Sequence, residues 1–436
     1  MSDNTSAVRE RPVRARGIRP GLLVLTLLAL VLTAAAELIG SHKVKIGPGA
    51  ITLFPIIWGL LLGAAVSIQR IRPVPVRLQR AATHIVEVGV LLLGVRLCFV
   101  VGHELPVLKE ASAALLFQEI GHLFGTIALS LPLAVMLKMG RSAVGACFSI
   151  DRESSFAMVS ERFGPDSEEY RGVLGMYIFG SVVGALYVTL LASVLAGTGW
   201  LSPLALAMGT GVGSGSVMAA SSAAIAAQFP EMADQIVALA AVSNLVTTLL
   251  GVYVGMFVAL PLADRFYRLL TRRTGPVPAA EAPDLQATPE PEDAETSRVR
   301  PFAAIGIALA GMLVADVVYS GGFDPRALLG FALVSAVVLV GLAIKRVIKI
   351  PAVVGSSVLA ILATSPISPV ADVVLSLVDP VEFLAMTTPI LVFAGLSIGK
   401  DLPALKRMGW KIVPVGMVSF AASFLVSALI AQVFLG

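Results

Sequence analysis

The chain has 436 residues, 57% of them hydrophobic and only 14% charged, with a mean hydropathy of +0.89. Soluble globular proteins carry about a quarter of charged residues, and apolar runs long enough to cross a ~30 Å hydrocarbon core recur along the whole chain. The net charge is +4, but the basic residues lie between apolar runs, as in cytoplasmic loops, and do not indicate nucleic acid as a partner. The sequence therefore predicts an all-α polytopic protein in contact with the lipid bilayer.

A basic tail, residues 1–20, precedes the first apolar run at 21–40. The alternative to a span there is a cleaved signal peptide, but the run is long and a second one follows almost at once. Basic loops alternate with the later runs and place the N-terminus in the cytoplasm. Further spans are expected at 51–68, 81–101, 112–137, 172–196 and 234–261, which completes a first membrane block over 21–273.

Residues 274–299 interrupt the apolar pattern. The stretch is rich in Pro, Ala and acidic residues without apolar periodicity, which is typical of a disordered cytoplasmic linker. A second membrane block, 300–436, follows. Its spans are expected at 301–320, 327–344, 350–366, 383–399 and 412–435. This scheme has about eleven full spans, provided that two segments rich in small residues, 142–168 and 203–228, do not cross.

Two short motifs occur in both blocks. The sequence "GHELPVLK" (102–109) matches "GKDLPALK" (399–406), and upstream "PIIWG" (55–59) matches "PAVVG" (351–355) at almost the same offset. The basic loops give the two copies opposite orientations across the membrane. Part of the second block is therefore expected to be an inverted repeat of 21–137, an architecture common in secondary transporters.

A weaker repeat lies within the first block, where residues 145–163 align with 211–229. Each copy is a short segment of small and polar residues followed by one full span, so these copies would be inverted too. Chance similarity between apolar sequences is the alternative explanation.

The second copy includes the run "GTGVGSGSVMAASSAAIAA" (209–227), which has no lysine for a phosphate-binding loop and no nucleotide-binding glycine spacing. Glycines in a membrane allow close helix packing or a break in the helix. Four alternating glycines exceed what packing needs and cost a helix about 1 kcal/mol each relative to alanine. We therefore favour re-entrant or broken segments at 142–168 and 203–228, with tight packing of straight helices as the alternative.

A helix broken inside the membrane offers N–H groups to an anion and carbonyl groups to a cation. The expected solute ligands are Arg152, Ser154, Ser155, Gly211, Gly213, Ser214, Gly215, Ser216 and Asn244. The groups expected to couple an ion are Asp151, Glu119, His122, Thr210 and Thr247.

Two of these assignments have a structural alternative. Arg152 could bind a solute carboxylate with both arms of its guanidinium, or pair with Asp151 or Glu153 in a cytoplasmic loop. Glu119 and His122 share one helix face and could relay protons, or could satisfy each other near the outer interface. Arg96 lies deeper in its span and requires a partner that the sequence does not identify.

Neither a metal site nor a hydrolytic triad is recognisable. Cys98 and Cys147 lie in or near apolar segments and form no disulfide framework. We expect no enzyme activity, metal or cofactor; Na⁺ or H⁺ are the candidate coupling ions, and a homodimer is a candidate assembly.

The stretches "FSIDRESSFAMVSERFG" and "TGVGSGSVMAASSAAIAAQFPEMADQIVALAAVSNLVTTLLGVYVGMFVALPLADR" resemble the bacterial membrane family called domain of unknown function 3100. The resemblance covers most of the chain apart from the tail and linker. More distantly, the chain is similar to the sodium–glutamate, 2-hydroxycarboxylate and bile-acid symporter-like families. That resemblance implies crossed, broken helices that move against a scaffold, and small organic anions or amino acids as substrates. The paired-glycine motifs of those families are absent, so no substrate residue can be transferred from them.

The sequence thus predicts a cation-coupled secondary transporter of a small organic anion or amino acid, in a bacterial inner membrane. The alternative is a structural or regulatory membrane protein that keeps a transporter-like fold but moves nothing. An intramembrane enzyme is disfavoured, because no paired catalytic residues occur at matched depth.

Overall fold

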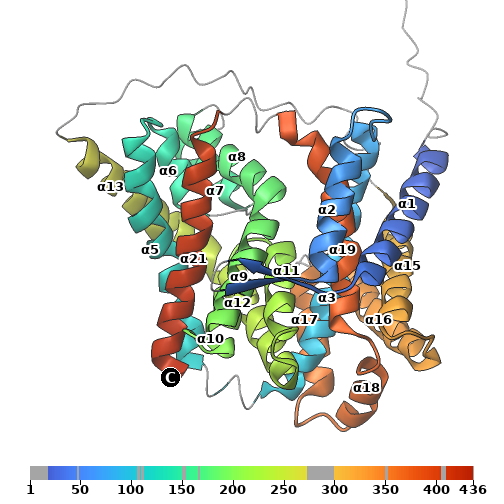
Figure 1. Ribbon diagram of the computed structural model, residues 1–436. Coiled ribbons are helices and arrows are strands. Elements are labelled where there is room, and N and C mark those ends of the chain that lie inside the picture. Colours follow the sequence, from blue (N-terminus) through green and yellow to red (C-terminus); the bar gives the residue numbers. More distant parts are fainter. Residues whose placement is uncertain are drawn as a thin grey trace, which may run out of the picture.

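The computed structural model describes residues 18–46, 49–105, 109, 112–149, 154–164, 167–272, 299–348, 352–403 and 409–435. The predicted tail and linker lie almost entirely outside these residues, and so do Asp151 and Arg152. Helices make up most of the described chain (Figure 1).

Eight helices in the described residues are long and apolar enough to cross a membrane. They are Pro20–Ile39, Val76–His103, Ser112–Met136, Glu168–Thr198, Pro301–Tyr319, Pro325–Val347, Phe383–Lys400 and Ile412–Leu435. Three shorter apolar helices accompany them: Pro55–Ile68, Gly215–Ala226 and Ala352–Thr364. The chain is therefore a multi-pass helical membrane protein, as the composition predicts. The count of eleven full spans stays a prediction.

The helices pack as two bundles that lie side by side in Figure 1. The first bundle consists of α1 (Ile18–Ile39), α2 (Pro55–Ile68), α3 (Val76–His103), α15 (Pro301–Tyr319), α16 (Pro325–Ile348), α17 (Ala352–Thr364), α18 (Ala371–Val378), α19 (Phe383–Ser397) and η4 (Ile398–Lys400). The second bundle consists of α5 (Ser112–Met136), α6 (Ser142–Cys147), α7 (Ser154–Phe163), α8 (Glu168–Phe179), η1 (Gly180–Gly184), α9 (Ala185–Thr198), α10 (Pro203–Gly209), α11 (Gly215–Ala226), η2 (Pro230–Met232), α12 (Ala233–Val254), η3 (Gly255–Ala259), α13 (Leu260–Thr271) and α21 (Ile412–Leu435).

The bundles do not follow the two blocks of the sequence. Helices α1 to α3 pack with α15 to α19 from the far end of the chain, whereas the last helix, α21, packs along α5. The seam between the bundles is formed by α9, α11 and α12 on one side and by α2, α3 and α19 on the other.

A β-hairpin departs from the all-α prediction. Strand β1 (His42–Ile46) pairs antiparallel with β2 (Gly49–Leu53), with Val44 opposite Ile51. β-Branched residues on both sides of a Gly-Pro-Gly sequence favour such a hairpin. Because β2 uses the first residues of the span predicted at 51–68, helix α2 begins only at Pro55.

Two helix pairs in the first bundle make matching contacts. In one, Ser67 Oγ of α2 donates to the Leu396 carbonyl of α19 (2.8 Å); in the other, Thr364 Oγ1 of α17 donates to the Phe99 carbonyl of α3 (2.6 Å). The two hydrogen bonds occupy equivalent positions in the repeat, because Thr364 lies as many residues after Ser67 as Leu396 lies after Phe99. Each pair is parallel: contacts ascend from Gly59–Thr388 to Ser67–Leu396 in the first pair and from Cys98–Ser357 to Gly102–Thr364 in the second.

Helices α3 and α19, by contrast, run antiparallel. Gly89 lies against Ile390, and Arg96, further along α3, bonds to Val381, which precedes α19. Because α2 is parallel to α19 and α17 is parallel to α3, α2 and α17 also run in opposite directions.

The glycine run is where one helix stops and another begins. Helix α10 ends at Gly209 and α11 begins at Gly215. At Gly211 a Cβ atom would collide with the Ser243 side chain of α12, and Gly213 has φ +74°, which side chains disfavour. The run therefore combines close packing with a true break, two uses that the sequence left as alternatives.

Candidate functional site

A cavity of about 370 Å³ opens at the N-terminus of α11, in the seam between the bundles. Its polar lining residues are Thr83, Glu87, Tyr177, Ser181, Ser214, Ser216, Asn244, Thr248, Ser397 and Lys400. Gly215 also lines it, so four of the predicted solute ligands, namely Ser214, Gly215, Ser216 and Asn244, meet in one place.

Asn244 hydrogen-bonds to the non-helical backbone between α10 and α11, beside this cavity. Its Nδ2 donates to the carbonyl oxygens of Gly211 (2.9 Å) and Gly213 (3.3 Å). The hydroxyls of Ser214 and Ser216 lie 3.1 Å apart, and the Ser214 side chain does not cap α11. The first-turn N–H groups of a helix have no intrahelical partner and carry partial positive charge, so this end of α11 suits a carboxylate.

Two charged residues, Glu87 and Lys400, line the cavity. Lys400 Nζ donates to Asp401 Oδ2 (2.5 Å), while Glu87 accepts from His84 at 2.9 Å. The lining therefore combines charges of both signs with hydroxyls, an amide and the first-turn N–H groups of α11.

Other predicted ligands lie elsewhere. Ser155 is buried and donates to Ser149 Oγ (3.0 Å), and Ser154 is the first residue of α7. Gly211 and Gly213 contribute carbonyls to Asn244 and do not line the cavity. Thr210 and Thr247 donate to carbonyls of their own helices, Ala207 and Ser243.

Glu119 and His122 of α5 are both buried but face different helices. Glu119 Oε1 lies 3.6 Å from where a Cβ on Gly251 of α12 would be, and His122 Nδ1 bonds to Ser423 Oγ of α21. Because α12 also carries Asn244, Glu119 contacts the helix that lines the cavity without lining it.

A second cavity, of about 460 Å³, lies at the other end of α11. Its charged lining residues are Glu37, Arg96, Asp234, Asp379 and Glu382. Arg96 donates from Nε to the Val381 carbonyl (3.1 Å). Arg96 was recognisable from the sequence as a charge deep in a span, whereas Glu37 was missed, although a carboxylate near the end of an apolar run is itself a functional signal.

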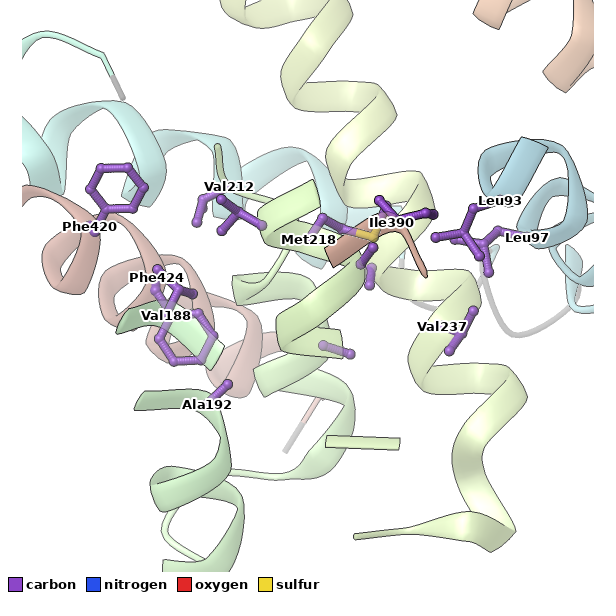
Figure 2. Packing of buried hydrophobic residues seen from close by; sticks show 14 of the residues in the cluster. Leu93, Leu97, Val188, Ala192, Val212, Met218, Val237, Ile390, Phe420 and Phe424 are labelled. Atoms are coloured by element: carbon purple, nitrogen blue, oxygen red, sulfur yellow. The ribbon is translucent and has the colours of Figure 1, made fainter. Parts of the chain in front are cut away.

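An apolar cluster lies in the seam between the two cavities. Met218 of α11 and Ile390 of α19 lie near Leu93 and Leu97 of α3 (Figure 2). Val237 of α12 belongs to the same cluster. All five side chains are at least 95% buried. The cluster separates the polar surfaces at the two ends of α11.

An ion-pair network links the ends of several helices in the second bundle. Arg141 donates to Glu169 Oε1 (2.5 Å) and Asp264 Oδ1 (2.9 Å), and Asp264 also accepts from Arg268 (2.8 Å). Burial lowers the pKa of Arg141, but its hydrogen bonds to Asp264 and Glu169 outweigh this and raise it above the ordinary value. Burial likewise raises the pKa of Tyr267, whose ring lies under the guanidinium.

In the described residues, no group of three or more His, Cys, Asp or Glu side chains could hold a metal ion. The observed features define a multi-pass helical membrane protein with an interrupted helix between two bundles and a polar cavity at each end of that helix.

The sequence matches the family described as "Protein of unknown function (DUF3100)" over residues 34–269, and the chain belongs to this family. No curated protein and no solved structure matches it. The more distant likeness to known symporters stays a prediction.

Proposed function

We propose that this protein is a cation-coupled secondary transporter that moves a small organic anion or amino acid across a bacterial cell membrane by alternating access. The observation that carries the proposal is the cavity at the start of α11, where Ser214, Ser216 and Asn244 meet the open end of an interrupted helix. Hydroxyls and first-turn N–H groups recognise a carboxylate without covalent chemistry. The proposal accordingly includes no enzyme activity.

The arrangement of the two cavities supports alternating access. Both lie in the same seam, and each is lined by α2, α3, α11, α12 and α19. Helix α11 has 12 residues, so the cavities lie about 18 Å apart along its axis. A small tilt of one bundle against the other would open the apolar cluster around Met218 toward one side and close the seam on the other.

The matching helix pairs support an inverted repeat. Units α2–α3 and α17–α19 carry the repeated sequence motifs, run in opposite directions, and exchange equivalent hydrogen bonds through Ser67 and Thr364. Two related units of opposite orientation give a transporter two equivalent conformations by exchanging their roles.

We propose that α10–α11 enters the membrane from the outer face and returns to it. Ser202, before α10, bonds to Gln432 near the end of α21, whereas Gly209 lies against Phe424 near the middle of that helix. At the end of α11, Gln228 bonds to Ser193 near the end of α9. The pair α6–α7, followed by α8, is proposed as the inverted counterpart entering from the cytoplasm.

The coupling ion is proposed to be Na⁺ or H⁺. Glu119 is the buried carboxylate on the α5–α12 contact, and His122 bonds to α21. Protonation of Glu119 would change the charge beside α12, the helix that carries Asn244. Asp151, Thr210 and Thr247 remain further candidates.

The second candidate function is a structural or regulatory protein that binds no moving solute. Four predicted ligands line one cavity, which favours transport over this alternative. Polar groups around an empty space cost free energy unless they are hydrogen-bonded, so a purely structural contact between the bundles would not be stabilised by them.

A flux assay in proteoliposomes tests the proposal. The probes are labelled L-alanine, L-glutamate, lactate and succinate, each under an inward Na⁺ gradient, an inward H⁺ gradient or neither. We expect gradient-dependent uptake of at least one probe, lost in a Ser214→Ala/Ser216→Ala variant and kept in Ser222→Ala, whose hydroxyl is buried outside the cavity. Absence of flux for a broad panel of such solutes would favour the non-transporting alternative.

A further inference from the structure

The second cavity differs in charge between its floor and its mouth. Arg96 and Glu37 are 6% and 8% exposed and form the buried part of the lining. Asp234, Asp379 and Glu382 are exposed and form the acidic mouth. A volume of about 460 Å³ falls in the range of small-molecule sites, ~300–1,000 Å³.

No acidic side chain in the described part of the chain is hydrogen-bonded to the guanidinium of Arg96, although Asp234, Asp379 and Glu382 are near enough to act on it electrostatically. Among the described residues its only hydrogen bond is the one from Nε to the Val381 carbonyl, and no carboxylate lies within ion-pair distance of it. A buried guanidinium is costly unless its N–H groups are hydrogen-bonded. The remaining N–H groups of Arg96 therefore present a fixed fork to the cavity, and a carboxylate is the group that such a fork binds best.

In the same cavity, Glu37 places a buried carboxylate oxygen without a hydrogen-bond donor from the described part of the chain. Its Oε1 atom is buried and has no hydrogen-bond partner among the described residues, while the Thr388 side chain lies within hydrogen-bonding reach of the carboxylate. Both residues line the cavity. An ammonium group would supply the donors that this carboxylate lacks.

The acidic residues at the mouth of the cavity discriminate between ligands by their charge. Asp234, Asp379 and Glu382 surround the entrance with negative charge, which attracts cations and zwitterions and repels dianions. An anion such as succinate would find one favourable group, Arg96, and several unfavourable ones.

We propose that this cavity is a second binding site and that it takes a zwitterionic amino acid, with the carboxylate on Arg96 and the ammonium on Glu37. The assignment rests on the proposed transport function in one respect: it narrows the solute from organic anions and amino acids to amino acids. The site lies at the opposite end of α11 from the cavity of Ser214 and Asn244.

Binding to the full-length protein in detergent tests the site without requiring transport. The probes are the natural amino acids, measured by thermal shift and then by calorimetry. For the tightest amino acid, its N-acetyl derivative lacks the ammonium and its amide lacks the carboxylate. We expect both derivatives and succinate to bind at least about 10-fold more weakly, since each loses a charged hydrogen bond.

Two single-residue variants assign the binding to this cavity. Glu37→Gln should weaken amino-acid binding about 10-fold or more and reduce the preference over the N-acetyl derivative. Arg96→Lys keeps the charge but loses the fork, and should weaken binding and reduce the preference over the amide. Ser376→Ala, an exposed position on α18, is the matched control. Glu37→Gln keeps size and shape, so it tests the site even if Arg96 variants fail to fold.

The outcomes separate this inference from the transport proposal. Uptake of succinate without any binding of amino acids would overturn the inference and leave transport intact. Amino-acid binding that is indifferent to Glu37→Gln and Arg96→Lys would also overturn it. Binding that depends on both residues, in a protein without measurable flux, would support the site and contradict transport.

Discussion

Asn244 stabilises the break in the glycine run with a single side-chain amide, bonded to two buried carbonyls that have left helical geometry. An asparagine within an apolar span is unfavourable unless it forms hydrogen bonds, so its sequence context predicts a partner. The partners themselves, the carbonyls of Gly211 and Gly213, become evident only when α12 is packed against the break.

Replacing Asn244 by leucine should therefore destabilise the protein. An unpaired buried acceptor costs about 1–3 kcal/mol, and leucine has similar bulk, so we expect a loss of this order in the free energy of unfolding. Denaturant unfolding in detergent measures it, with Ser376→Ala as a near-neutral control. An unchanged midpoint would mean that other groups satisfy these carbonyls.

Arg141 carries a second residue-scale prediction. Removing one partner of a fully buried ion pair costs about 3–5 kcal/mol. Arg141 is 39% exposed while Glu169 and Asp264 are largely buried, so Arg141→Met should cost less, about 1–3 kcal/mol. The control is Arg265→Met, an exposed position on α13 that loses the same charge. Equal effects on the unfolding free energy would contradict a specific role for Arg141.

The hydroxyls of Thr210 and Thr247 show a limit of residue-type reasoning. Their sequence context fits ion ligands, yet both donate to carbonyls of their own helices, as threonines in helices commonly do. The residue type supplies the donor and acceptor, and only the rotamer decides which group it meets.

Among the elements, α10 and α11 were accessible from sequence because four alternating glycines are incompatible with one straight helix. The β-hairpin was missed because its two five-residue strands precede an apolar run that reads as one span. Apolar periodicity locates long helices well, but it does not mark where a short strand ends and a helix of 14 residues begins.

Gly211→Ala tests the close approach of the break to α12. The added methyl would collide with Ser243, so we expect lower thermal stability and loss of solute binding. Gly306→Ala is the matched control, because that helical glycine has open space around it. There alanine should be neutral or stabilising by up to about 1 kcal/mol. Equal tolerance at both positions would argue against tight packing at Gly211.

At the scale of the whole molecule, the division into two bundles was not predictable from the blocks of the sequence. Helix pairing such as α2 with α19 or α5 with α21 joins segments hundreds of residues apart. Composition identifies which segments enter the membrane, but the contacts among apolar helices depend on shape, for example on Gly63 lying against the backbone of α19.

A pair of cysteines across the seam should stop relative motion of the bundles. A Cβ on Gly215 would lie 3.9 Å from Cβ of Val90, within the range of about 3.5–4.5 Å that a disulfide needs. We expect oxidation of Val90→Cys/Gly215→Cys to block uptake and reduction to restore it.

The control disulfide lies inside one bundle. A Cβ on Gly355 would lie 3.6 Å from Cβ of Ile344, and both residues belong to the first bundle. Ile344→Cys/Gly355→Cys should cross-link equally well without blocking uptake. Inhibition by both pairs, or by neither, would contradict a cycle based on movement at the seam.

The chain passes between the bundles more than once, and this determines whether two fragments of the protein could dissociate. A cut within residues 273–298 would divide the chain into two pieces, and each piece would own helices in both bundles: α1–α3 and α5–α13 in one, α15–α19 and α21 in the other. The pieces are therefore interlocked, and separating them would require opening α2 from α19 and α5 from α21 together. After cleavage at a protease site inserted there, we expect the two fragments to copurify in mild detergent, whereas two independently folded halves would come apart.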